Sequence, residues 1–418
     1  MWCSGAALSL VTACCAVAIA QPLEEAPVVA PAEPPPPDVT SALADVVEGV
    51  QLHGFVTQGA FVSTSNDYIG RSSQGSLELF EAGVNASSQL GDRLRAGVQL
   101  FARNVGDFDS PVRFDWAYLD YRLRPWLGVR AGIIKMPFGL YNEYVDIDAS
   151  RTPILLPQSI YLIRNRDALL AHHGFTLYGN VGLGGAGELD YQAWMGTLEI
   201  PENALVLQGA TLERATTRYI TGAQLFWTPP VANLRIGATA IRASIDFDVR
   251  VDAQTVAALV DAGLVAPDFD GGFVVSQRPS TWIVGSAEYT RGDTVVAAEY
   301  ARTSTRQRTT IPALLPTTEE ESERFYAMIT HRFARWLEVA GYYSVEHKDA
   351  NDRRGRDPKW MRAFHAWQRD ASLTLRFDVN DHWLWKIEGH FIDGTAQLTH
   401  PDPERYWGLF LVRTTVTF

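Results

Sequence analysis

The chain has 418 residues, of which 46% are hydrophobic and 20% are charged, and its formal net charge is −12. This acidic balance argues against a nucleic-acid-binding protein, which needs a basic face. After residue 20 no apolar run reaches the 18 or more residues that a transmembrane helix requires, so the sequence excludes a helical membrane protein. It does not exclude a barrel, whose strands turn only every second residue toward lipid.

Residues 1–20 have the pattern of a secretory signal peptide. An apolar stretch leads to small residues at 18 and 20, which is the pattern of a cleavage site. No Lys or Arg precedes the stretch, which departs from the usual pattern. The alternative is lipid attachment at Cys14, because the residues before it resemble a lipobox. All three cysteines lie in this segment, so the mature chain would hold neither a disulfide nor a zinc-thiolate site.

Residues 21–48 are rich in Pro, Ala, Val and Glu and cannot build a core. Such a segment favours extended polyproline II structure, and we expect a spacer or a periplasmic arm.

From residue 49 to residue 418 the sequence predicts a single all-β domain with sixteen strands. Each run is close to the length of a tilted membrane-spanning strand, or somewhat longer. The runs lie near 50–64, 76–88, 94–104, 112–122, 127–135, 173–182, 188–198, 218–228, 234–247, 280–290, 294–307, 323–333, 337–347, 366–378, 383–393 and 406–418.

The final run shows the alternation that suggests a membrane barrel. Phe410, Val412 and Val416 share one face with the terminal Phe418, whereas Arg413 lies on the other face. In the preceding run, Trp, Ile and Phe residues likewise alternate with Lys, Glu and His. Because a soluble β-sandwich also alternates, this pattern alone leaves a secreted soluble protein open.

The connections favour the barrel. The even-numbered connections are short, whereas the odd-numbered ones run from about a dozen residues to 37, which is the arrangement of tight turns and long loops in outer-membrane barrels. Tryptophans at 126, 227, 336 and 383 lie beside the tight turns. Their position predicts an aromatic girdle at one membrane interface.

The longest connection, residues 136–172, contains both charged residues and two apolar stretches, 154–157 and 160–163. A solvated loop would leave these stretches exposed. We therefore expect the loop to fold inward against the barrel wall, which would bring its charges into the lumen. Sixteen strands leave a channel rather than a packed interior, so such a loop would form the constriction.

The segment that enters this loop, Arg130-x-Gly132-x-x-Lys135-x-Pro137-Phe138-Gly139, resembles the corresponding segment of phosphate-selective and related proteobacterial porins. The resemblance covers residues 50–418. It implies a sixteen-stranded antiparallel barrel in the outer membrane of a Gram-negative bacterium, with an inward-folded third loop. It also implies a homotrimer and contacts with lipid, lipopolysaccharide and the outer-membrane assembly machinery.

The candidate pore residues fall in two groups, whose charges would create a transverse field across the opening. Alternation places Arg130 in the lumen, and Lys135 is expected to join it because the strand ends there. The loop candidates are Glu143, Asp146, Asp148, Arg151, Arg164, Arg166 and Asp167, and the wall candidates are Arg95, Arg103, Arg130, Lys135, Arg376, Lys386 and Arg413. Many of the chain's arginines have a simpler explanation in genome composition or in contacts with lipopolysaccharide.

Several other motifs in the sequence do not predict a functional site. Residues 252–263 predict a short helix, capped by an Asp and ended by a Gly. The GxGxxG match at 182–187 precedes an alternating strand, so it predicts a hairpin turn rather than a phosphate site. The His pair at 172–173 and the Asp-x-Asp pairs at 146–148 and 268–270 lack the further ligands of a metal site, although a surface calcium ion stays open.

The sequence therefore predicts a passive channel for small hydrophilic solutes and ions, without catalytic residues, metal or cofactor. The alternatives are a substrate-selective channel that binds phosphate, a dicarboxylate or a sugar, and an adhesin or enzyme built on a barrel.

Overall fold

The computed structural model describes residues 49–200, 210–312, 316–398 and 402–418. The predicted signal peptide (1–20) and the Pro-rich segment (21–48) lie outside the described residues.

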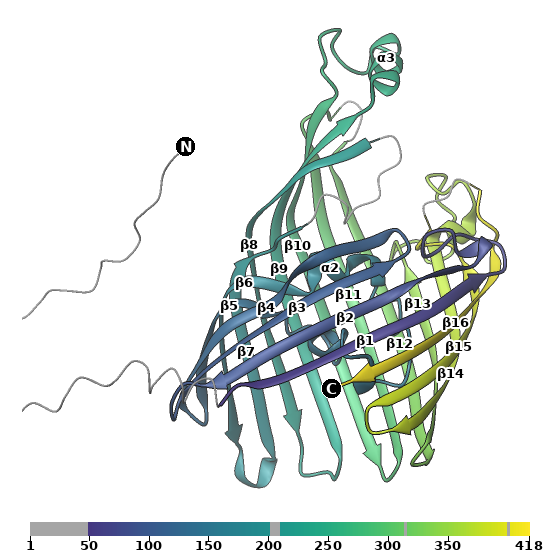
Figure 1. Cartoon of the computed structure of the whole chain (residues 1–418). Helices are drawn as coiled ribbons and strands as arrows, with labels where there is room; N and C mark the ends of the chain where they lie inside the picture. The colour runs from purple at the N-terminus through teal and green to yellow at the C-terminus, as the bar shows by residue number, and fades with distance from the viewer. Residues whose placement is uncertain (1–48, 201–209, 313–315, 399–401) are drawn as a thin grey trace, which may run out of the picture. The chain divides into compact units, whose positions relative to one another are not determined.

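Sixteen antiparallel strands form one closed barrel, in which each strand pairs with its neighbours in the chain and β1 pairs with β16 (Figure 1). The predicted fold and strand count are confirmed. The strands are β1 (Gln51–Ser63), β2 (Ser76–Gln89), β3 (Leu94–Val105), β4 (Phe108–Arg124), β5 (Leu127–Lys135), β6 (Ala171–Gly182), β7 (Glu188–Thr197), β8 (Ala210–Thr228), β9 (Leu234–Val251), β10 (Gly272–Arg291), β11 (Thr294–Thr309), β12 (Thr318–Ala334), β13 (Leu337–His347), β14 (Trp367–Asn380), β15 (Trp383–Gly394) and β16 (Tyr406–Thr417).

The helices are short and lie in the connections. They are η1 (Ser72–Gln74), η2 (Asn142–Tyr144), η3 (Asp148–Ser150), η4 (Ile163–Asn165), α2 (Arg166–Leu169), η5 (Gly184–Ala186), α3 (Ala253–Asp261) and η7 (Ala363–Ala366). Among the described residues, none of these helices has both the length and the apolar character needed to cross a membrane.

The chain closes the barrel with its last residues. Register pairs Phe55 with Thr417, and the backbone of Phe418 exchanges two hydrogen bonds with Gly54, of 2.9 and 3.0 Å. The terminal residue is therefore part of the ladder and not a frayed end.

Alternation divides the wall into an apolar outer face and a polar inner face. On β15, Trp385, Ile387 and Phe391 are exposed on the outside, whereas Lys386 and Glu388 are buried on the inside. On β16 the last part follows this division, with Arg413 and Thr415 inside, whereas the inner face of the first part is apolar, with Trp407, Leu409 and Leu411 buried. The tryptophans beside the tight turns at 126, 227, 336 and 383 are all exposed, as expected for side chains on the outer rim.

The structure corrects two expectations about strand length and loops. The third connection is a tight turn, because only Gly106 and Asp107 separate β3 from β4. Pro111 falls at an irregularity in the β3–β4 pairing, where a residue without an amide proton is tolerated. The strand therefore begins before this proline and continues past it, instead of starting near residue 112 as predicted.

The second correction concerns β8, β10 and β12, which begin 5–8 residues before the predicted runs. The added part of β12 carries Thr, Ser and Glu, and that of β8 mixes charged and Thr side chains with Ala and Leu, whereas that of β10 includes Phe273 and two valines. In all three strands the added residues continue the pairing with neighbouring strands. Figure 1 shows β8 to β10 rising above the other strands, with α3 at the tip. The predicted helix at 252–263 is confirmed: Asp252 caps α3 by accepting a hydrogen bond from the Thr255 amide at 2.7 Å.

Candidate pore constriction

The connection between β5 and β6, residues 136–170, folds into the barrel lumen and is called loop L3 here. It is two residues shorter than predicted, because β6 starts at Ala171. Its apolar stretches are buried as expected: Ile154 is fully buried, and Ile160 and Tyr161 are also buried. Ile154 packs into a cluster with side chains of β2 and β16, whereas Ile160 and Tyr161 pack with side chains of β11 to β13. Loop L3 therefore crosses the lumen and contacts opposite parts of the wall.

A buried carboxylate on β11 binds the first part of loop L3. Glu299 accepts hydrogen bonds from the Leu140 amide at 2.9 Å and from the Tyr326 hydroxyl at 2.7 Å. It also accepts a hydrogen bond from the Tyr161 hydroxyl, so one side chain binds two separate parts of the loop. Further along the same wall, the Gln224 side chain donates to the Gly139 carbonyl at 3.0 Å.

A second buried carboxylate, on β15, binds the middle of the loop. Glu388 accepts the amides of Ile154 and Leu155 at 2.6 and 2.8 Å. It also contacts the Thr374 hydroxyl at 2.6 Å and the His390 ring at 2.9 Å, so the buried charge has polar partners on several sides.

Wall cations bind the loop backbone between these two anchors. The Lys386 ammonium donates to the carbonyls of Asp148 and Arg151, each at 2.7 Å. The Arg376 guanidinium donates to the Ala149 carbonyl at 2.8 Å. Both cations face inward, and both are engaged by loop L3.

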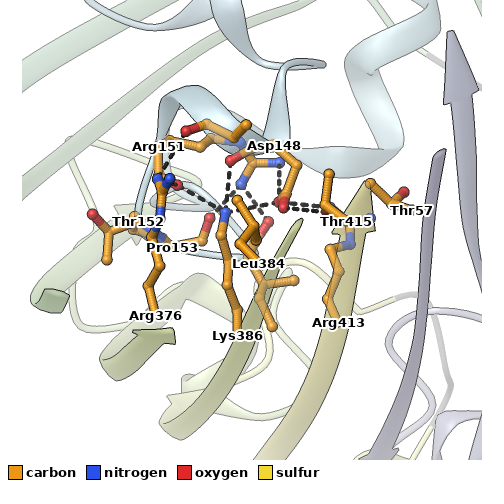
Figure 2. Close-up of polar contacts among 12 residues, drawn as sticks. Thr57, Asp148, Arg151, Thr152, Pro153, Arg376, Leu384, Lys386, Arg413 and Thr415 are labelled. Atoms are coloured by element: carbon orange, nitrogen blue, oxygen red, sulfur yellow. Dashed lines mark hydrogen bonds and ion pairs between the residues drawn. The ribbon is translucent and has the colours of Figure 1, made fainter. Parts of the chain in front are cut away.

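The side chain of Asp148 lies at the centre of this contact (Figure 2). Its Oδ1 lies 2.9 Å from Lys386 Nζ and 3.2 Å from Arg413 Nη1, and its Oδ2 accepts a hydrogen bond from Thr415 at 2.7 Å. Arg151 lies farther away, with Nη2 at 3.9 Å. Burial alone would raise the pKa of Asp148, but these cations outweigh it and hold the pKa well below its usual value.

A second ion-pair cluster lies where the two ends of loop L3 meet. Asp146 is 2.6 Å from Lys135 and 2.5 Å from Arg166, and Asp115 on β4 is 2.7 Å from the same Arg166. Lys135 points into this cluster and not toward lipid, as expected at a strand end. Burial acts to raise the pKa of Asp146, but Arg166 and Lys135 hold it well below its usual value.

Arg130 faces inward from β5 and keeps some exposure. Its Nε lies 2.8 Å from Asp120, and the guanidinium lies over the ring of Tyr178 at 4.4 Å. Two strands along the wall, Gln192 of β7 donates a hydrogen bond to Glu143 of loop L3 at 3.3 Å. Burial raises the pKa of Glu143, and the nearby charge of Arg130 opposes that rise.

The remaining candidates are placed less centrally. Arg95 faces inward and donates to the Ser87 hydroxyl at 3.0 Å. Arg103 is buried beside the Ile163 carbonyl, at 3.5 Å. Arg164 lies in η4 and is partly buried, and Asp167 lies in α2.

A cavity of about 300 Å³ lies between loop L3 and the wall. Arg103, Arg151 and Arg413 line it together with Ile154 and Ile163. The carboxylates of Glu81 and Asp146 also line it, so the cavity combines guanidinium groups and two carboxylates with an apolar surface.

Among solved structures, several barrels are similar to this one. An anion-selective porin from Comamonas acidovorans is 12% identical, with a TM-score of 0.55 over 88% of this chain and 99% of that chain. The outer-membrane channel DcaP of Acinetobacter baumannii is 10% identical, with a TM-score of 0.53 over 88% and 97%. OmpF of Salmonella typhi, in a complex with daunomycin, is 12% identical, with a TM-score of 0.53 over 88% and 97%.

The chain has the fold of an outer-membrane porin. At these identities the similarity establishes the fold alone. No protein-family model and no curated protein matches the sequence.

The sequence analysis did not include four wall residues that hold loop L3 among its candidate pore residues. Glu81, Asp115, Glu299 and Glu388 are buried wall carboxylates, and each contacts loop L3 or a cation that binds it. The signal that could have found them is strand parity, because each lies on the inner face of its strand. At Asp115, an irregularity in the β3–β4 pairing obscures that parity.

Of the motifs that the sequence analysis set aside, the Asp-x-Asp pair at 146–148 lies within this constriction, where both carboxylates bind cations instead of a metal ion. The GxGxxG match forms η5 in the turn between β6 and β7, so the predicted hairpin is confirmed. Within the described part of the chain, no group of three or more His, Cys, Asp or Glu side chains is arranged to hold a metal ion.

Proposed function

We propose that the protein is an outer-membrane channel that lets small hydrophilic solutes and ions diffuse across the membrane, with loop L3 as its constriction. The observation that carries this proposal is the closed barrel with an apolar outer face and a charged interior crossed by an inward-folded loop. Apolar clusters fill part of the interior where loop L3 packs against the wall, but long charged side chains such as Lys386 and Arg413 also point to the centre, which the interior of a soluble sandwich rarely holds.

The same proposal includes the location and assembly of the chain. The fold supports the outer membrane of a Gram-negative bacterium, reached with a signal peptide at residues 1–20. A homotrimer is supported by the porin neighbours, one of which is a trimer form of OmpT of Vibrio cholerae. Membership in the phosphate-selective group rests on the segment from Arg130 to Gly139 alone.

The loop restricts the passage strongly. Lys386, Glu388 and Arg413 would extend into water in an open lumen, yet each is at most 2% exposed. We therefore expect a small conductance that favours compact polar solutes, since transport through a pore depends on its narrowest ring.

Planar-bilayer recording on the purified full chain tests the proposal. We expect stepwise currents, and a reversal potential under a salt gradient that shifts toward cation preference in Arg130→Gln, because this variant removes a partly exposed lumen cation. Glu319→Gln, which changes an outer surface residue, is the control. Absence of any current, together with binding to cells, would support an adhesin instead.

A further inference from the structure

The carboxylate of Asp148 fills a binding site whose donors belong mainly to the barrel wall. Lys386 on β15 and Arg413 on β16 contact one oxygen, and the Thr415 hydroxyl contacts the other at 2.7 Å. The wall side chains are 0%, 2% and 1% exposed, respectively. Two buried cations and a hydroxyl that converge on one carboxylate form a complete anion site.

The strands of the wall set the backbone positions of the donors in this site. Lys386 and Arg413 are directly paired in the β15–β16 register, and Thr415 follows Arg413 on the same strand face. The second guanidinium nitrogen of Arg413 is fixed by Glu81 of β2 at 2.7 Å. If Asp148 moved away, the three residues would stay side by side on the wall and Arg413 would remain bound to Glu81.

If the Asp148 carboxylate left the site, Lys386 would lose its counter-charge. Among the residues that the structure describes, the close polar contacts of Lys386 are with loop L3: the Asp148 carboxylate and the carbonyls of Asp148 and Arg151. A buried cation that loses its counter-charge is strongly destabilising, so the vacated site would attract a carboxylate or fill with water.

The space next to the site shows what else could bind there. The cavity of about 300 Å³ includes Arg413 and Glu81 at the site itself, and Ile154, Leu155 and Ile163 farther along. Its volume lies at the lower end of small-molecule sites. Of the three donors, Arg413 lines the cavity, so the cavity could hold a small apolar body whose carboxylate reaches the site beside Arg413.

We propose that Lys386, Arg413 and Thr415 form a binding site for the carboxylate of a permeating solute, and that Asp148 is a tethered substitute that occupies the site until a solute displaces it. The solute class is a small monocarboxylate with an apolar body. This inference rests on the proposed channel function, because the solute must reach the site through the lumen. Displacing Asp148 would also release the part of loop L3 that crosses the lumen at this point.

The tether sets how strongly a solute must compete. A tethered group acts at an effective concentration on the order of millimolar or higher, so dilute carboxylates would leave the loop in place. Removing the Asp148 carboxylate should therefore strengthen the binding of free carboxylate without any change to the wall.

The test compares Asp148→Ala with Asp146→Ala, using sodium formate as the probe and sodium chloride at equal ionic strength as the reference. Both variants remove one carboxylate from the same loop. In Asp146→Ala, however, Lys135 and Arg166 keep Asp115 as a partner, so no anion site is vacated. In bilayer recordings, formate should block the Asp148→Ala current in a saturable way, at a concentration roughly tenfold or more below that needed for the wild type or Asp146→Ala. Adding Lys386→Met to Asp148→Ala should abolish that difference.

Thermal unfolding of the same proteins in detergent gives a second readout that needs no current. Formate should raise the unfolding midpoint of Asp148→Ala more than chloride does, and should not do so for Asp146→Ala or for the double variant. If Asp148→Ala does not assemble, Asp148→Asn keeps the side-chain volume and serves both measurements.

The outcomes separate the two proposals. Equal formate effects on Asp148→Ala and Asp146→Ala, in both current and unfolding midpoint, would overturn the carboxylate site even if every variant conducts. Formate-specific stabilisation of Asp148→Ala without any conductance would retain the carboxylate site but refute the channel.

Discussion

Glu143 is the loop carboxylate whose charge should respond to mild acid. It is partly buried opposite Gln192, and burial raises its pKa above the ordinary value of a glutamate. As the pH falls, Glu143 therefore becomes neutral before exposed glutamates do. We expect the reversal potential under a salt gradient to shift toward anion preference between pH 7 and pH 5. Glu143→Gln should already have the shifted value at pH 7 and should show little further change.

Asp146 and Asp148 should respond to pH in the opposite way. Nearby cations depress both pKa values in the folded protein. Each carboxylate therefore stabilises the folded loop fully when the pH is above the unfolded-state pKa of about 3.9. This stabilisation is lost only as the pH falls through the depressed folded-state pKa. In a Glu143→Gln background, the single-channel conductance should therefore stay constant from pH 7 to pH 5 and rise only in stronger acid. A rise between pH 7 and pH 5 would show that these ion pairs do not hold the loop.

At the scale of strands, a row of glycines crosses the wall beside loop L3. Register places Gly132 of β5 opposite Gly174 of β6, and Gly174 opposite Gly196 of β7. A Cβ atom on Gly174 would lie 2.1 Å from the Met195 carbonyl oxygen, which belongs to the backbone and cannot turn aside. The three strands can therefore approach this closely only with glycine at this position.

Gly174→Ala should consequently lower the yield of folded barrel. Gly285→Ala is the matched control, because a Cβ on this strand glycine of β10 would meet nothing within 4 Å. The heat-modifiable fraction on electrophoresis measures folding of both variants. Equal folded fractions would show that the wall adapts at Gly174 and that the close approach is not required.

The sequence predicts most of these elements because each depends on local pattern. Alternation locates the strands, and the apolar stretches 154–157 and 160–163 predict that the long loop turns inward. The wall residues that contact the loop could not be predicted in this way. Asp148 contacts Lys386 and Arg413 across more than 230 residues of chain, and only barrel closure and register bring them together. Strand parity gives the direction of a side chain but not what covers it.

At the scale of the whole molecule, the outer face shows where the membrane should lie. On β12, the outward residues Phe333, Ile329 and Phe325 are exposed and apolar, and on the paired β11 the apolar outward series ends at Tyr300. Beyond that level, Arg302 of β11 pairs with Glu321 of β12 at 2.5 Å. The change from apolar to paired charged residues on these adjacent strands indicates that the upper parts of β11 and β12 extend beyond the bilayer.

This boundary can be tested by placing the same charge on either side of it. Ile329→Arg puts a guanidinium in the apolar belt, where it should cost about 2–4 kcal/mol at the bilayer midplane. Ser304→Arg puts one on the outer face of β11 above Tyr300, where the cost should fall to about 0–1 kcal/mol. Urea titration of the barrel in lipid vesicles, followed by tryptophan fluorescence, measures both free energies of unfolding. Because both side chains are solvent-accessible in the isolated barrel, a soluble protein would tolerate the two substitutions equally, and only a surrounding bilayer makes the first one costly.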